Sequence, residues 1–191
     1  MLNEKEKEKF ISMKVEIINL NILASCYIRK LNRIIYLWQK TTREFVFEEY
    51  TSMRYMENGI ILHLTNLDDQ SSNYSFRAIY KELNKSSINQ KKIKLLNDKL
   101  KKFRQKINHI KVNHRIDRIA HLNYDSSPNL DDFFDFDNCL RPLIFQANEI
   151  ADLLWGVKVN YKFNLGKHEG ILDFREIAEK KKVDLDSQKG Y

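Results

Sequence analysis

One segment, residues 93–110, constrains the fold of this chain more than any other. Its apolar residues alternate steps of three and four, which is the spacing of one face of an α-helix. The opposite side is rich in lysine and therefore suited to water. A stripe this regular predicts a long helix that packs against other helices. The apolar positions are Ile93, Leu96, Leu100, Phe103, Ile107 and Ile110.

The scarcity of chain breakers favours the same class of fold. The 191 residues include only five glycines and two prolines, whereas sandwiches and barrels need many turns. With 42% hydrophobic and 12% aromatic residues, the chain can bury a core of its own. We therefore expect an all-α protein with a helical domain over residues 1–157. Residues 158–191 are expected to form a C-terminal extension, partly flexible, with an extended piece and a short helix.

Four further segments predict helices, over residues 10–39, 43–67, 76–84 and 138–155. In the first, apolar residues recur at steps of three and four, which describes one long amphipathic helix, and in the second the apolar residues are expected to face inward. These residues are Val15, Ile18, Ile22, Cys26, Leu31, Ile35 and Trp38 in the first segment, and Phe47, Tyr50, Met53, Met56, Ile60 and Leu64 in the second.

Charge and cysteine usage restrict the class of protein. Cys26 and Cys139 lie far apart in predicted helices without a second ligand at metal-site spacing, so we expect reduced, buried thiols. No segment approaches the roughly 20 uninterrupted apolar residues of a membrane span, and the start, NEKEKEKF, lacks the apolar core of a secretory signal. These features predict a cytoplasmic protein without a membrane partner. The net charge of +7 favours polyanions such as RNA.

The helical stripe turns polar when it is continued beyond Ile110. The next positions at the same steps are His114, Asp117 and His121. At about 100° per residue, His114 and Asp117 lie within about 40° of His121, and Arg118 lies about 60° away. Arg115 lies about 120° around the axis and about 9 Å along it from His121. It would share one phosphate with His121 only if the helix unwinds, or if a second copy supplies its own arginine.

A histidine beside an arginine suits phosphodiester chemistry. An imidazole accepts a proton from a ribose 2′-hydroxyl or returns one to the leaving oxygen, and a guanidinium holds the developing charge on phosphorus. No metal is then required. Asp117, one turn before His121, would orient the ring. The alternative is an ion-pair network that closes the helical bundle and has no catalytic role.

The segment RIDRIAHLNYD, residues 115–125, resembles the signature of HEPN proteins, an all-helical superfamily of RNases and nucleotide-binding modules. Their mark is an arginine, then four to six residues, then a histidine. Residues 53–83 are similar to the matching region of the abortive-infection AbiU-type branch, and the helix over 140–155 falls where that branch has its closing helix. Together the resemblance covers roughly residues 15–157.

The resemblance implies an antiparallel helical bundle with long helices. Arg115 and His121 would be the motif pair and Arg118 an auxiliary cation, and a homodimer would build one composite site from two chains. Two positions depart from the family pattern. Ile116 replaces a residue that is commonly polar, and Tyr124 lies three residues after the histidine, where some HEPN toxins carry a modified tyrosine after two.

The function that the resemblance implies is a metal-independent RNA endonuclease in phage defence or a toxin-antitoxin system. Such a protein would act on RNA, associate with an antitoxin protein and need no cofactor. The alternative, from another class, is a non-catalytic helical dimer that binds RNA, a nucleotide or a protein partner through the same groove.

Other polar and aromatic residues have two interpretations each. His63, among apolar neighbours, favours a structural role. His168 and Glu169 are expected in a loop between glycines, and a lone pair specifies no metal site. The lysine-rich side of residues 91–106 would either follow an RNA backbone or only be solvated. Three aromatic residues would stack bases, but their spacing favours the core; these are Tyr74, Phe76 and Tyr80.

Overall fold

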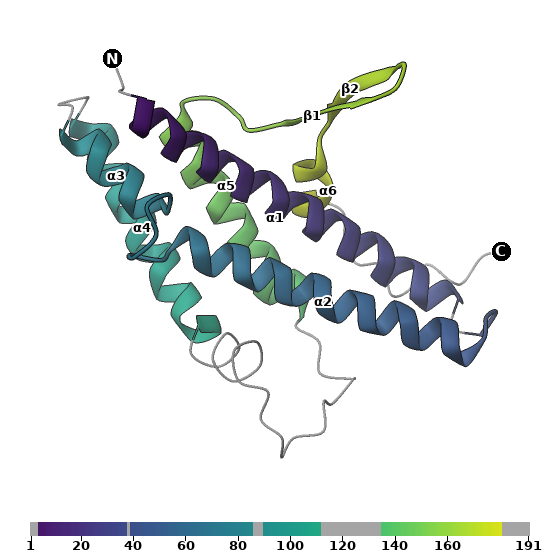
Figure 1. Cartoon of the computed structure of the whole chain (residues 1–191). Coiled ribbons are helices and arrows are strands. Elements are labelled where there is room, and N and C mark those ends of the chain that lie inside the picture. Colours follow the sequence, from purple (N-terminus) through teal and green to yellow (C-terminus); the bar gives the residue numbers. More distant parts are fainter. Residues whose placement is uncertain (1–3, 38, 86–89, 112–134, 181–191) are drawn as a thin grey trace.

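A computed structural model describes residues 4–37, 39–85, 90–111 and 135–180. Within these residues the protein is a helical bundle with one small β-hairpin (Figure 1), which confirms the all-α class. The elements are α1 (Glu4–Leu37), α2 (Arg43–Leu67), α3 (Phe76–Lys85), α4 (Gln90–Ile110), the π-helical turn η2 (Phe136–Leu140), α5 (Arg141–Trp155), β1 (Tyr161–Leu165), β2 (His168–Leu172) and α6 (Phe174–Lys180).

Helices α1 and α2 form a long antiparallel pair (Figure 1). The Thr42 hydroxyl caps α2 by accepting a hydrogen bond from the Phe45 N–H at 3.2 Å, which satisfies one of the free donors of the first turn. Further along, a Cβ atom placed on Gly59 would lie 2.8 Å from Leu23 Cδ1. The two helices therefore pack more closely at Gly59 than an alanine would allow without movement of that leucine.

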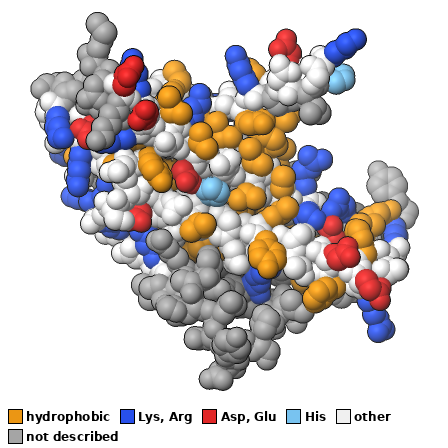
Figure 2. Space-filling model, viewed as in Figure 1, with side chains coloured by type: hydrophobic (Ala, Val, Ile, Leu, Met, Phe, Trp, Pro, Cys, Tyr) orange, Lys and Arg blue, Asp and Glu red, His pale blue; other side chains and the backbone are white. Residues whose placement is uncertain are grey.

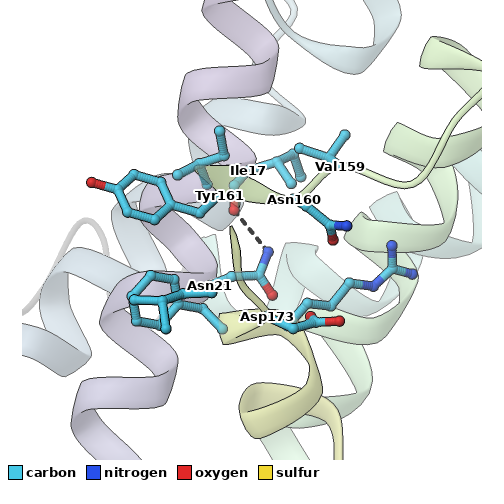
Figure 3. A pocket seen from close by; sticks show the side chains of 10 residues that line it. Ile17, Asn21, Val159, Asn160, Tyr161 and Asp173 are labelled. Carbon is cyan, nitrogen blue, oxygen red and sulfur yellow. Dashed lines mark hydrogen bonds between the residues drawn. The ribbon is translucent and has the colours of Figure 1, made fainter. Parts of the chain in front are cut away.

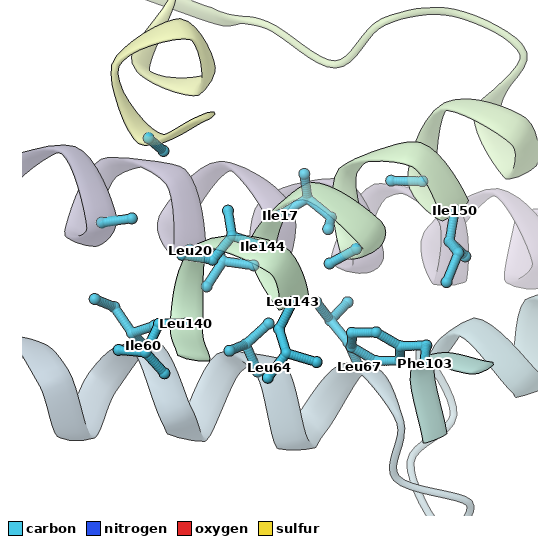
Figure 4. Close-up of a cluster of buried hydrophobic side chains, with 14 of the residues drawn as sticks. Ile17, Leu20, Ile60, Leu64, Leu67, Phe103, Leu140, Leu143, Ile144 and Ile150 are labelled. Atoms are coloured by element: carbon cyan, nitrogen blue, oxygen red, sulfur yellow. The ribbon is translucent and has the colours of Figure 1, made fainter. Parts of the chain in front are cut away.

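The core lies where α1, α2, α4 and α5 meet (Figure 4). Each large aliphatic side chain that is fully buried there contributes about 1.5–3 kcal/mol. α3 joins the same core through Phe76, whose ring meets that of Phe103 edge-on with 5.7 Å between the centroids. Among the core residues are Ile17 and Leu20 of α1, Ile60 and Leu64 of α2, Phe103 of α4, and Leu143 and Ile144 of α5.

The stripe on α4 is confirmed. All six of its apolar positions, from Ile93 to Ile110, are buried, because the opposite side of the helix offers almost no apolar alternative. The stripe predicted for α1 is only partly buried, with Ile18 and Leu31 packed against the core. Val15 is 50% exposed, and Ile18, Ile22, Cys26 and Leu31 are half-buried. The residues that α1 buries are Phe10, Met13, Ile17, Leu20, Ala24, Tyr27, Ile28 and Ile34.

The difference has a physical reason, because α1 is apolar on two opposite sides: Val15 and Met13 lie about 160° apart around the helix axis. α1 packs against α2, α5 and α6, and these contacts cover one apolar face and leave much of the other open. The side chains of Ile35 and Trp38 lie outside the described residues. In α2 the helix bounds and the burial of Met53, Ile60 and Leu64 are confirmed, but Phe47 is 57% exposed.

The helix predicted over residues 138–155 consists of two parts, the π-helical turn η2 and the helix α5, which begins at Arg141. The π-helical turn η2 starts at Phe136. Asp135 caps its N-terminus, because the Asp135 side chain accepts a hydrogen bond from the Asn138 N–H. Helix α5 then carries Pro142 in its first turn and ends at Gly156, whose φ of 83° is left-handed, a conformation that favours glycine. Cys139, expected to be buried, is exposed, and Cys26 is half-buried; both thiols are free, as expected.

The C-terminal part contains the expected extended piece and short helix. The extended piece is an antiparallel hairpin in which His168 pairs with Leu165 and Glu169 pairs with Asn164. His168 and Glu169 therefore lie in a strand, and their placement in a loop was wrong. α6 packs against α1 and α5, with Ala178 fully buried.

One stretch of α1, Lys7–Ile34, is long and apolar enough by composition to cross a membrane. No such segment was expected from the sequence. A core helix of a soluble protein passes the same test, and α1 supplies much of the core described above. Its apolar composition therefore has a sufficient explanation in the packing of the bundle.

Candidate functional site

The residues predicted to form the site lie outside the described residues. They are His114, Arg115, Asp117, Arg118, His121 and Tyr124, all within residues 112–134. Their roles remain predictions. The structure describes the residues on both sides of that segment. The last turn of α4 precedes it, and η2 follows it.

At the end of α4, the carboxylate of Asp68 binds two cations. Asp68 is the C-cap of α2 and is only 2% exposed. Arg104 Nε lies 3.2 Å from both carboxylate oxygens, and Lys111 Nζ lies 2.6 Å from one of them. Arg104 also donates to the Asp68 carbonyl at 3.0 Å. This cluster fixes the end of α4 to the end of α2, directly before the predicted motif.

A second buried polar group lies near Tyr27, a residue of α1 that contacts η2. Glu57 of α2 is fully buried and accepts a hydrogen bond from Arg54 at 3.2 Å. The ring of Tyr27 stacks on that of Phe136, with 5.5 Å between the centroids. Burial raises the pKa of the Tyr27 hydroxyl well above its usual range; the charge of Glu57 raises it further and Arg54 partly opposes both. Tyr27 is therefore uncharged at neutral pH and is suited to hydrogen bonding rather than to proton abstraction.

The outer side of α4 carries an exposed group of lysines, here called the lysine face: Lys94, Lys101, Lys102 and Lys106. Within the described residues, none of the four forms an ion pair with a carboxylate. Two other cations of the helix are paired, because Lys99 binds Glu149 at 2.9 Å and Arg104 binds Asp68. The sequence indicated this face, and the structure shows it exposed.

A groove of about 380 Å³ runs between α4 and α5, with Leu95 and Lys102 on one wall and Gln146 and Ile150 on the other. Its volume lies in the range of small-ligand sites. The Gln146 Oε1 atom is buried and has no hydrogen-bond partner among the described residues. This oxygen would accept a hydrogen bond from a polar group that enters the groove.

The pocket between α1 and the C-terminal segment is smaller. Ile17, Asn21, Val159 and Asp173 contribute to its lining (Figure 3). Its cavity volume of about 10 Å³ leaves room for about one water molecule. The pocket therefore belongs to the packing of the C-terminal hairpin on α1 and is too small for a substrate.

The structure also describes His63 and the three aromatic residues that the sequence singled out. The imidazole of His63 contacts the carboxylate of Glu16 on α1, which is consistent with the structural role expected for it. Phe76 lies in the core, whereas Tyr80 is half-buried and Tyr74 is exposed. In the part of the chain that the structure describes, no group of three or more His, Cys, Asp or Glu residues is placed to hold a metal.

Buried polar residues that the sequence did not single out include Glu57, Asp68 and Asn148. Two of them had a signal in the sequence. Glu57 lies four residues after Met53 and three before Ile60, and Asn148 lies at the same spacing between Ile144 and Ala151. A polar residue on the buried face of a helix must find a partner inside the protein, so both were detectable once the buried face was known.

Comparison of the chain with protein-family models, with curated proteins and with solved structures gave no match.

Proposed function

We propose that the protein is a metal-independent RNA endonuclease of the HEPN type, acting in the cytoplasm in phage defence or a toxin-antitoxin system. His121 would transfer protons to and from the ribose and leaving oxygens. Arg115 or Arg118 would hold the phosphate. His114 and Asp117 would support His121.

The observation that carries this proposal is the burial of the whole α4 stripe up to Ile110. Since the first six positions of the stripe face the core as predicted, its polar continuation at His114, Asp117 and His121 stands out from a regular pattern. Polar side chains that interrupt an apolar stripe are costly to bury, and they are therefore candidates for a functional role.

The charges around the end of α4 are consistent with an anionic substrate. Arg104 and Lys111 share one buried carboxylate, so two cations are balanced there by a single negative charge. An RNA phosphate bound close to this point would meet a positive field.

A homodimer is part of the proposal, because Arg115 and His121 are too far apart on one regular helix to share a phosphate. Apolar side chains gather over α1 and α2 on the face shown in Figure 2. Ile11, Val15, Tyr55 and Leu62 are among the exposed residues of these two helices. Exposed apolar surface of this kind is typical of interfaces between proteins. An antitoxin protein is the second partner that we propose.

Cleavage of purified RNA in EDTA tests the proposal. Removal of a general acid or base slows a reaction about 100-fold or more, so we expect His121→Ala to lose at least that much activity. His168→Ala is the matched control, because His168 is exposed on β2, remote in sequence from the motif. It should cleave like the parent protein.

Two results would contradict the enzyme proposal: no cleavage by the parent protein, or equal cleavage by the parent and the His121→Ala variant. RNA that is bound but left intact would favour the alternative, a non-catalytic RNA-binding dimer. Light scattering that finds a monomer at assay concentration would remove the composite site from the proposal.

A further inference from the structure

The positive charge of this protein is concentrated on one helix. The complete chain has 33 basic and 26 acidic residues, a net charge of +7. Helix α4 contains seven lysines, one arginine and a single acidic residue, Asp98, and so has a net charge of +7 by itself. The rest of the chain has 25 basic and 25 acidic residues and is formally neutral. The excess charge is thus a property of α4 and not of the whole surface.

Two groups among the cations of α4 differ in their packing. Lys99 and Arg104 are half-buried and bind the carboxylates of Glu149 and Asp68. The lysine face, in contrast, is exposed and has no ion-pair partner within the described residues. Asp98 is the one carboxylate on the same helix, and no ion pair holds it to a lysine in that part of the chain. Carboxylates of neighbouring helices thus neutralise Lys99 and Arg104. The lysine face remains available to solvent or to a ligand.

The spacing of the lysine face suits a phosphate backbone. Lys94 and Lys101 lie about 20° apart around the helix axis, and Lys102 and Lys106 extend the face to a width of about 140°. From Lys94 to Lys106 the face is about 18 Å long. Phosphates of a stacked strand follow one another at about 3.4 Å along the helix axis, so about five of them would fit along this face.

A solvated helix face usually mixes both signs of charge, because lysines three or four residues apart repel each other. On α4, Lys102 is followed at such spacing by Lys106. A bound polyanion would relieve this repulsion and would release counterions. Lysine, a flexible point charge, suits contacts that do not depend on base sequence.

We infer that the lysine face of α4 binds the phosphate backbone of RNA without sequence specificity. The choice of RNA among polyanions rests on the proposed function. The face belongs to the helix that leads into the predicted catalytic motif, and Lys106 lies 15 positions before His121 in the chain. Backbone contacts on α4 would hold an RNA strand while the motif acts on it.

Fluorescence anisotropy with a short labelled single-stranded RNA tests the inference. The parent is the full chain with His121→Ala, so that the RNA stays intact. The test variant adds K94Q, K101Q, K102Q and K106Q. The matched control adds K7Q, K81Q, K162Q and K167Q instead, which removes the same charge from exposed lysines of other elements. Circular dichroism of both variants verifies that they fold.

Each lost phosphate contact on a single strand reduces the salt slope of log K by about 0.7. We therefore expect the slope of the test variant to fall by about 3, and its affinity at about 50 mM salt to fall at least about tenfold. The control should stay within about threefold of the parent. Equal losses in both variants, unchanged binding by the test variant, or tighter binding to anionic phospholipid vesicles than to RNA would overturn the inference.

The result is separable from that of the cleavage assay. Binding that depends on the lysine face without any cleavage by the unmutated protein would leave the inference standing and refute the enzyme proposal. Cleavage by the unmutated protein, together with a test variant that binds RNA like its parent, would support the enzyme proposal and refute the inference about the lysine face.

Discussion

Asn21 of α1 and Asn148 of α5 exchange two side-chain hydrogen bonds inside the bundle. Each amide nitrogen donates to the other's oxygen, at 2.7 and 3.0 Å, and both side chains are buried. Asn21 also donates to the Ile17 carbonyl, and Asn148 donates to Glu179 of α6. One pair of amides thereby connects three helices that are far apart in the sequence. Satisfied buried networks of this kind favour one register of packing over others.

We predict that Asn148→Ala lowers the free energy of unfolding by about 2–3 kcal/mol, because the Asn21 oxygen and the Glu179 carboxylate each lose a donor inside the protein. Urea denaturation measures the change. Asn108→Ala is the control, since Asn108 is exposed on α4, and it should change stability by no more than about 0.5 kcal/mol. Equal effects of the two substitutions would show that the pair contributes nothing specific.

The raised pKa of Tyr27 predicts that the folded protein loses stability at alkaline pH. Its folded-state pKa is raised from 10.0, first by burial and then by the charge of Glu57. Above about pH 10 the unfolded chain therefore releases a proton that the folded protein keeps, and the free energy of unfolding falls by up to about 1.4 kcal/mol per pH unit. Below pH 10 the hydroxyl is protonated in both states, and this contribution to stability is fully present.

Denaturation of the parent protein and of Tyr27→Phe between about pH 8 and 11 measures this effect. The variant should lose less stability over this range than the parent does. Tyr55→Phe serves as the control, because Tyr55 is 74% exposed, and it should follow the parent. A Tyr27→Phe curve parallel to that of the parent would refute the shifted titration.

We expect Asp68 to stabilise the end of the bundle that precedes the predicted motif. Asp68→Asn leaves Arg104 and Lys111 without their shared carboxylate, and loss of one partner from a buried ion pair costs about 3–5 kcal/mol. Because both cations are partly exposed, we expect a smaller cost of about 2 kcal/mol. Thermal or urea unfolding measures it. The exposed Asp98→Asn is the control, and a cost as small as that of Asp98→Asn would contradict the role given to Asp68.

Prediction from sequence succeeded where a helix has one apolar face. On α4 the stripe from Ile93 to Ile110 left one way to bury the helix, and all six positions are buried. The same approach succeeded only in part on α1, where Val15 and Met13 lie on opposite apolar sides of the helix and only Met13 is buried. The hairpin was foreseen merely as an extended piece, because its exposed strand β2 has no alternation of burial to detect. The predicted catalytic residues lie outside the described part of the chain, and their arrangement stays a prediction.

The sequence by itself determined that the chain forms helices, where α2 and α5 end, and which face of α4 is buried. These properties follow from local features: few breakers, capping residues and the three-four spacing of apolar side chains. Tertiary structure decided which of two apolar faces α1 buries, that Asn21 meets Asn148, and that Asp68 binds two cations from α4. These depend on neighbours up to 127 positions away in the chain, and no local pattern specifies such partners.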